Sequence, residues 1–308
     1  MIVLVFVIIL ILAVSAVVYQ LYRGVFCYPV KKHADVHSIP DSKLYAKYRD
    51  SMLECVEDIE KTPCEEVHIA SQEGFRLYGR LFYMKEGAPT VIFFHGYHGT
   101  AEWDGYGLFK VCKNYEINIL MIDERAHGKS EGTAITFGIK ERYDCKLWAE
   151  YVAGRFGENA DIILAGVSMG AASIIMASEL GLPANVKGLI ADCGYSEPAA
   201  IIKETIRTMK LPVKPVYQII RLGTAMFGRF DLEEATVIQA VKKLNIPILF
   251  IHGNNDSVVP VSMCEELYEN VSGKKEIFWA DGADHANSAI TDYEGYEKAV
   301  LSFLNGLK

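Results

Sequence analysis

The sequence predicts an α/β fold with a doubly wound, mostly parallel sheet. From about residue 90 to the C-terminus, short apolar runs rich in β-branched and aromatic residues alternate with helical patterns, which is the order expected of βαβ units. Polar or glycine-containing loops follow these runs. The 308 residues include 51% hydrophobic side chains, enough to bury one large core, so we expect a single globular domain.

The sheet should begin with an antiparallel edge. Two strand-like runs, 66–70 and 75–83, flank the turn residues Gln72 to Gly74, a pattern typical of a hairpin. Further strands are expected at 90–95, 118–123, 161–166, 187–192, 247–252 and 275–280. Helices are expected near 101–114, 139–156, 170–181, 261–271 and 289–305, after a lead-in helix over 41–61.

The stretch 196–243 is too long for a simple connection between two of these strands, so we expect a helical lid insertion there. Pro212 and Pro215 interrupt its apolar residues, which predicts two or three short helices. As a lid, the insertion would cover the site and contact the substrate, with Met226 and Phe227 as candidate contacts. The alternative is an ordinary packed helical excursion.

The pentapeptide Gly166-Val167-Ser168-Met169-Gly170 has the pattern of a nucleophile elbow. It follows the apolar run 162–165 and precedes a helical pattern, so Ser168 should lie in a sharp strand-to-helix turn. The two glycines carry no side chain to collide in such a turn. Ser168 is therefore the candidate nucleophile.

A serine hydroxyl needs a histidine base and a carboxylate that orients the histidine. Asp256 lies just past the predicted strand 247–252, and His285 lies in the loop after the strand 275–280. The carboxyl ends of parallel strands meet at one edge of a sheet, so Ser168, Asp256 and His285 should converge there. Asp284 is a competing carboxylate, but adjacent residues rarely face each other.

An oxyanion hole is expected from two backbone amides. One follows the nucleophile, at Met169, and the other belongs to the loop after the strand 90–95, at Tyr97. His95 and His98 in that loop invite a metal interpretation, but no cysteine or paired carboxylate accompanies them in the sequence. We therefore expect no metal and no cofactor.

With these residues in view, the chain from about Glu65 onward resembles the α/β-hydrolase superfamily. It is most similar to bacterial membrane-anchored serine hydrolases related to the serine aminopeptidase and monoacylglycerol-lipase-like group. The segment from Asp123 to Ser130 matches the D-x-R-x-x-G-x-S pattern of many members, and His95-Gly96 matches their oxyanion strand. The resemblance implies an α/β-hydrolase fold and acyl transfer to water.

The N-terminus predicts a single membrane span. Every residue from Ile2 to Val18 is apolar except Ser15. A cleaved signal peptide would require basic residues before this run, and no Lys or Arg precedes it. We assign residues 1–22 to a transmembrane anchor, 23–64 to a linker with the lead-in helix, and 65–308 to the hydrolase domain. Residues 1–28 should then be dispensable for folding and activity.

Charge and cysteine usage both favour a cytoplasmic catalytic domain. Arg23, Lys31 and Lys32 all follow the span, as the positive-inside rule requires. The seven cysteines are odd in number and lack C-x-x-C spacing, which suits free thiols in a reducing compartment. The net charge of −8 makes nucleic acid an unexpected partner, and the sequence identifies no protein partner.

The expected function is hydrolysis of a carboxylic ester or thioester, including lipid-like esters, by a membrane-anchored Ser-His-Asp enzyme. A serine peptidase or amidase acting on small peptides is the alternative within the same chemistry. A catalytically silent, membrane-tethered binding module is the alternative from a different class.

Overall fold

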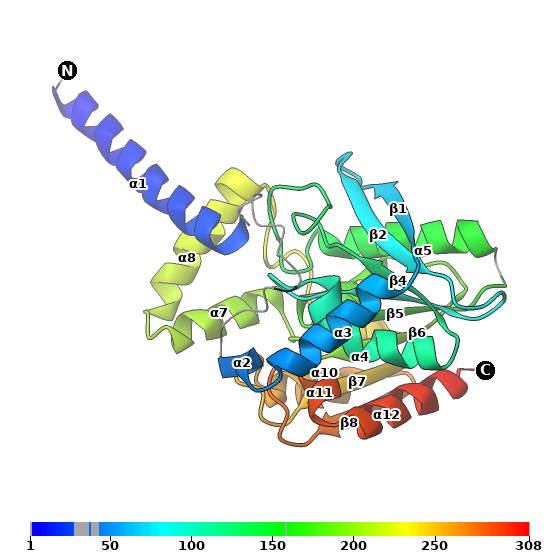
Figure 1. The fold of residues 1–308 in the computed structure, drawn as a ribbon. Coiled ribbons are helices and arrows are strands. Elements are labelled where there is room, and N and C mark those ends of the chain that lie inside the picture. The colour runs from blue at the N-terminus through cyan, green and yellow to red at the C-terminus, as the bar shows by residue number, and fades with distance from the viewer. Residues whose placement is uncertain (1, 28–36, 38–42, 158, 308) are drawn as a thin grey trace.

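One mixed sheet forms the centre of the molecule. The computed structural model describes residues 2–27, 37, 43–157 and 159–307, and its eight-stranded sheet has the order β1-β2-β4-β3-β5-β6-β7-β8 (Figure 1). The strands are β1 Glu65–Ala70, β2 Arg76–Phe82, β3 Thr90–Phe94, β4 Asn118–Ile122, β5 Ile162–Val167, β6 Val186–Asp192, β7 Ile248–Gly253 and β8 Lys275–Ala280. All eight predicted strands are confirmed to within a residue or so at each end.

The first two strands form the predicted antiparallel edge. β2 pairs antiparallel with both β1 and β4, whereas β3 to β8 are parallel to one another where they pair. Gly74, with φ of +85°, supplies the left-handed turn between β1 and β2. The carboxyl ends of six parallel strands therefore lie along one edge, which positions their loops together.

Helices cover both faces of the sheet. α3 (Arg49–Lys61), α4 (Ala101–Asn114) and α12 (Tyr293–Asn305) pack on one face, and α5 (Glu141–Phe156), α6 (Met169–Ala177), α9 (Val237–Lys243) and α10 (Val261–Asn270) pack on the other. Within β3, Val91 and Phe93 belong to the first core, whereas Ile92 and Phe94 belong to the second. This alternation follows from the twofold period of a strand, and it explains why buried parallel strands read as continuous apolar runs.

Two predicted helices are divided in the structure. The lead-in segment forms α2 (Lys43–Ala46) and α3, while positions 41 and 42 lie outside the described residues. The C-terminal segment forms α11 (Ser288–Thr291) and α12, separated at Asp292. The Asp292 carboxylate accepts a hydrogen bond from the Gly295 amide at 2.9 Å, and this side-chain cap starts a new helix.

The insertion 196–243 contains α7 (Pro198–Thr208), α8 (Val213–Gly223), the π-helical turn η2 (Thr224–Gly228) and α9, so the predicted short helices are confirmed. Pro212 separates α7 from α8 as expected. Pro215 does not break the helix, because it lies in the first turn of α8, where a backbone N–H would have no acceptor within the helix.

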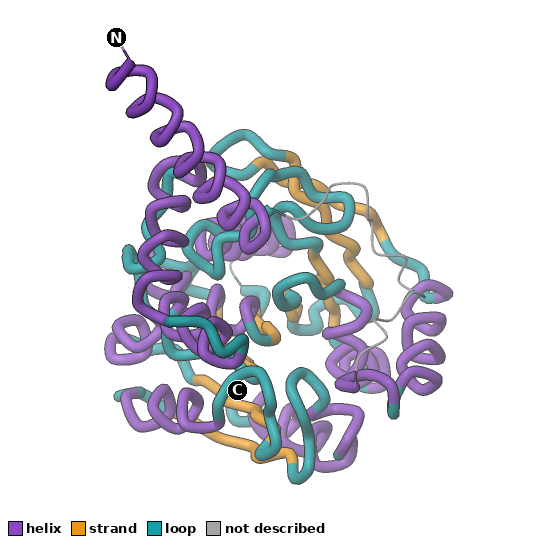
Figure 2. Tube along the Cα trace, turned by 90° about the vertical axis from the view of Figure 1, so that its left-hand side faces the viewer, coloured by secondary structure: helices purple, strands orange, loops and turns teal. Residues whose placement is uncertain are grey.

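The N-terminal helix α1 runs from Ile2 to Phe26 and projects from the domain in both views (Figures 1 and 2). It is long and apolar enough to cross a membrane. Its last turns are part of the domain, since Val18, Tyr22 and Phe26 are 3%, 5% and 0% exposed. The structure therefore does not support dispensability of residues up to 28, and the helix continues past the expected boundary at residue 22.

Candidate active site

Ser168 lies in a strained turn between β5 and α6. Its φ of +53° is rare for a residue with a side chain, and it marks the sharp reversal of the backbone. A Cβ on Gly170 would lie 2.0 Å from the Phe94 carbonyl oxygen, and one on Gly166 would lie 2.4 Å from the Gly170 carbonyl carbon. Both elbow glycines are therefore required by close backbone packing.

The structure brings Ser168, His285 and Asp256 together from three different loops. His285 Nε2 lies 3.0 Å from Ser168 Oγ, and His285 Nδ1 lies 2.8 Å from Asp256 Oδ2. These distances allow a hydrogen-bonded chain in which Nδ1 donates to the carboxylate and Nε2 faces the hydroxyl. Such a chain can move the serine proton to the imidazole.

Asp256 is held as a buried anion. Its Oδ1 accepts hydrogen bonds from the amides of Val258 and Val259, at 2.8 and 2.7 Å. Burial alone would raise the pKa of Asp256, but hydrogen bonds from His252 and His285 outweigh that effect and hold the pKa well below its usual range. The carboxylate that orients His285 is therefore ionised at neutral pH.

His252, at the end of β7, is a second imidazole beside Asp256. Its Nε2 lies 3.3 Å from Asp256 Oδ2 and 3.1 Å from the Val259 carbonyl oxygen. Burial opposes protonation, yet the hydrogen bond to Asp256 raises the pKa of His252. His252 therefore balances the charge of a carboxylate that has no access to water.

Asp284 does not face the imidazole of His285. Its Oδ1 accepts hydrogen bonds from the Ser257 amide and hydroxyl, both at 2.8 Å, and from the amide of His285 at 2.7 Å. Asp284 thus ties the loop of Asp256 to the loop of His285, which fixes the distance between these two residues.

Two backbone amides near Ser168 are free to serve as the predicted oxyanion donors. Among the described residues, the N–H groups of Tyr97 and Met169 donate to no acceptor; Tyr97 lines the cavity beside Ser168, and Met169 follows Ser168 as the first residue of α6. The neighbouring Gly96 amide is engaged, because it donates to Asp104 Oδ2 at 2.7 Å. Burial raises the pKa of Asp104 to about 6, although the Gly96 hydrogen bond opposes this rise.

The histidines of this region connect loops. His95 Nδ1 lies 2.8 Å from the Gly96 carbonyl oxygen and its Nε2 accepts from the Glu124 amide, while His127 Nε2 accepts from the His98 amide at 3.2 Å. Burial lowers the pKa of His95 and of His98 to about 4, so these rings are neutral at pH 7. Because both nitrogens of His95 are engaged, this ring is a poor metal ligand.

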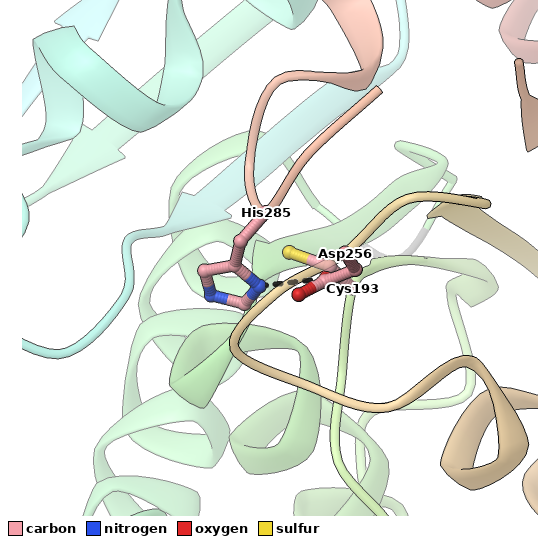
Figure 3. Close-up of side chains that lie close together, drawn as sticks. All are labelled: Cys193, Asp256 and His285. Atoms are coloured by element: carbon pink, nitrogen blue, oxygen red, sulfur yellow. Dashed lines mark hydrogen bonds and ion pairs between the residues drawn. The ribbon is translucent and has the colours of Figure 1, made fainter. Parts of the chain in front are cut away.

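Cys193 lies next to Asp256 and His285, and their potential ligand atoms lie within 4.8 Å of one another (Figure 3). Burial raises the pKa of the Cys193 thiol well above its usual value, so the thiol stays protonated. Both oxygens of Asp256 already accept hydrogen bonds. A metal ion here would have to break these bonds, and we interpret the cluster as packing beneath the imidazole.

Comparisons with known proteins show similarity to serine hydrolases. Residues 171–286 match the family model described as Serine hydrolase (FSH1), a range that contains Asp256 and His285 and begins just after Ser168. The chain is 26% identical over 257 residues to the uncharacterized protein YqkD of Bacillus subtilis, which covers 83% of each chain. It is 23% identical over 198 residues to the lysophosphatidylserine lipase ABHD12 of Danio rerio, which covers 61% of this chain and 49% of that one.

Solved structures define the fold. The esterase Pf2001 of Pyrococcus furiosus superposes with a TM-score of 0.63 and 23% identity, covering 81% of this chain and 94% of that one. Est1E of Butyrivibrio proteoclasticus, solved with ferulic acid, superposes with a TM-score of 0.61 and 22% identity, covering 78% and 98%. The chain has the α/β-hydrolase fold. Its residues 171–286 are in addition similar to a serine hydrolase family.

A cavity of about 220 Å³ opens beside Ser168 in this α/β-hydrolase fold. Its described lining comes from α2, the oxyanion loop, the start of α4, the elbow and the His285 loop, and consists of Tyr45, Gly96, Tyr97, His98, Gly99, Trp103, Asp104, Val167, Ser168, His285 and Ala286. None of these residues belongs to the insertion 196–243. Phe227 instead contacts α1, with ring centroids 5.1 Å from Tyr19 and 5.9 Å from Tyr22.

Sequence reasoning missed Tyr45, Asp104, His127 and His252. Tyr45 and Asp104 reach the cavity from helices whose place over the site depends on tertiary packing. His252 carried a usable signal, because it stands at the end of a buried strand four residues before Asp256. A polar residue at such a strand end is a candidate for the site edge.

Proposed function

We propose that this protein is a membrane-anchored serine hydrolase that cleaves carboxylic esters or thioesters. The observation that carries the proposal is the continuous contact from Ser168 Oγ through His285 to Asp256, with distances of 3.0 and 2.8 Å. The match to a serine hydrolase family model supports the same chemistry.

Ser168 Oγ attacks the carbonyl carbon while His285 Nε2 takes the hydroxyl proton. The amides of Tyr97 and Met169 donate hydrogen bonds to the oxyanion that forms. The tetrahedral intermediate collapses, and His285 returns the proton to the departing alcohol or thiol. Water then attacks the acyl-enzyme with His285 again as base, and this second collapse releases the carboxylic acid and restores Ser168.

Asp256 acts by orienting and stabilising His285. The carboxylate accepts a hydrogen bond from Nδ1–H of His285, which leaves the lone pair of Nε2 facing Ser168. The positive charge that develops on His285 then lies 2.8 Å from a fixed anion. Hydrogen bonds from two backbone amides keep that anion in place without a cost of reorganisation during the reaction.

Esters are favoured over amides by the relatives with named activities. Pf2001 is named an esterase, Est1E was solved with ferulic acid bound, and ABHD12 is named a lysophosphatidylserine lipase. For this chain we infer a small-molecule or lipid-like ester or thioester as substrate. The alcohol or thiol leaving group requires no recognition of a substrate amino terminus.

We further propose that α1 is retained as a single-pass anchor and that the catalytic domain faces the cytoplasm. The exposed apolar surface of α1 from Ile2 to Val17 supports the anchor. Arg23, Lys31 and Lys32 follow the span, which supports the orientation, although the two lysines lie outside the described residues.

Labelling with a fluorophosphonate probe tests the function directly. The full-length protein should react at Ser168, and the Ser168→Ala variant should not. Ser178→Ala is the matched control, because Ser178 lies just beyond α6 and its hydroxyl donates only to the Ile175 carbonyl. Labelling that survives in Ser168→Ala, or is lost in Ser178→Ala, contradicts the assignment.

A further inference from the structure

Three large apolar side chains are exposed together at the end of α8 and in η2. Leu222, Met226 and Phe227 are 46%, 47% and 37% exposed, and we call them the interfacial patch. The substrate cavity does not account for the patch, because none of the three residues lines that cavity. Such a patch on a soluble surface marks an interaction site.

A close crossing of α8 and α1 places the interfacial patch beside residues 18–22 of α1. A Cβ on Gly223 would lie 2.9 Å from Tyr22 Cβ and 3.4 Å from the Val18 carbonyl oxygen. The absence of a side chain at Gly223 therefore lets α8 contact the α1 backbone at this level. Phe227 adds an edge contact to Tyr19, at 5.1 Å between ring centroids.

This level coincides with the end of the exposed apolar part of α1. From Ile2 to Val17 the helix rises about 24 Å, and burial by the protein begins at Val18. A hydrocarbon core is about 30 Å thick. If α1 spans a bilayer, the core ends near Val18 to Tyr22, which is where α8 crosses.

Charge around the patch fits the surface of an anionic membrane. Arg23 follows Tyr22 on α1, and Arg229 follows the patch at the end of η2. Both side chains are exposed, and no carboxylate among the described residues pairs with either. Cations at the edge of an apolar surface are typical of segments that lie in the headgroup region of anionic lipids.

We propose that the interfacial patch docks into the boundary between headgroups and acyl chains of an anionic bilayer, as a second membrane contact beside α1. Arg23 and Arg229 contact lipid phosphates. The inference rests on the proposed embedding of α1. It goes beyond an anchor, because two contacts fix the orientation of the domain on the membrane, whereas one helix leaves it free to tilt.

The docked orientation connects the membrane to the cavity. Tyr97, which lines the cavity, donates its hydroxyl to the Val25 carbonyl oxygen at 2.8 Å, three residues past Tyr22. The wall of the cavity is thus attached to the end of α1 at the membrane surface. An ester held in the bilayer would then approach Ser168 from the membrane side.

Tryptophan quenching by brominated lipids tests the docking in the full-length protein, reconstituted in vesicles that contain phosphatidylglycerol. Leu222→Trp and Met226→Trp report on the patch, and Leu10→Trp reports on α1. Tyr83→Trp is the control, because Tyr83 is 51% exposed and stacks on Phe156, the last residue of α5. Figure 1 shows α5 on the opposite side of the domain from α8. The parent protein supplies the background from its native tryptophans.

We expect loss of fluorescence at Leu222→Trp and Met226→Trp with bromines near the headgroups, at Leu10→Trp with bromines deeper in the chains, and no loss at Tyr83→Trp. Quenching at Leu10→Trp without quenching at either patch position overturns the docking while leaving the anchor intact. No quenching at Leu10→Trp overturns both. A blue shift at the patch without quenching assigns the patch to a protein contact and also overturns the proposal.

Discussion

Removing residues 2–26 should destabilise the catalytic domain, whereas removing residues 2–17 should not. The shorter deletion takes away no buried side chain, but the longer one removes Val18, Tyr22 and Phe26 from the core. At about 1.5 to 3 kcal/mol for each buried side chain, their loss is worth about 5 to 9 kcal/mol. A domain of this kind has a total stability of about 5 to 15 kcal/mol.

Hydrogen bonds add to this loss. The Phe26 carbonyl oxygen accepts from the Ile135 amide at 2.7 Å, and the Val25 carbonyl oxygen accepts from the Tyr97 hydroxyl at 2.8 Å. Each contributes about 0.5 to 1.5 kcal/mol. Because Tyr97 also supplies a proposed oxyanion donor, its loop should lose order together with the fold, and ester turnover should fall with stability.

Urea unfolding and turnover of a soluble ester measure both effects. The 2–17 deletion should match the full-length protein in detergent in midpoint and turnover. The 2–26 deletion should unfold at a much lower urea concentration or fail to fold. If the two deletions unfold within about 1 kcal/mol of each other and turn over the ester equally, the buried end of α1 does not support the domain and the reasoning is refuted.

Three further predictions concern the site. Ser168→Ala and His285→Ala should each lower kcat for ester hydrolysis by about 10⁴-fold or more while the fold stays intact, because these residues act as a unit; appreciable turnover in either variant would overturn their roles. Asp256→Asn should be similarly severe in kcat and Asp284→Asn mild, since the amide oxygen introduced by the second substitution still accepts from the Ser257 amide; the reverse ranking would make Asp284 the acid. Asp192, the buried last residue of β6, accepts a hydrogen bond from the Ser288 hydroxyl at 3.0 Å. Burial raises the pKa of Asp192 to about 7, so the native state binds this proton more tightly than the unfolded chain, and the contribution of Asp192 to stability falls as the pH rises from about 4 to 7. The melting temperature of Asp192→Asn relative to the parent should therefore rise from pH 5 to pH 8, and a constant difference would contradict the buried charge.

The strands and the elbow could be predicted because their signals are local. A buried parallel strand needs apolar side chains on both faces, so β3, β4, β5 and β7 appear in the sequence as short apolar runs. The elbow requires glycines at Gly166 and Gly170, since the Phe94 carbonyl and the turn itself leave no room for a Cβ. These demands act within a few residues of the chain.

The pairing of Ser168 with His285 could be anticipated only as convergence at one sheet edge. The distances within the site depend on contacts between loops, such as the hydrogen bond from the Ser257 hydroxyl to Asp284, which joins the loops of Asp256 and His285 across 27 residues. Asp104 was missed for the same reason, since no local pattern shows that it will face the Gly96 amide. His252 was missed although its position at the end of β7, four residues before Asp256, was a usable signal.

The N-terminal helix and the insertion show most clearly what could not be predicted from the sequence. The sequence by itself determined that α1 is apolar and long enough for a span, and that 196–243 forms short apolar helices. Only the tertiary structure decided that Phe26 enters the core and that Phe227 packs on Tyr19 instead of lining the cavity. The physical reason is that the hydrophobic effect is not directional: an apolar pattern shows that a face will leave water, but not whether protein or another apolar phase will cover it.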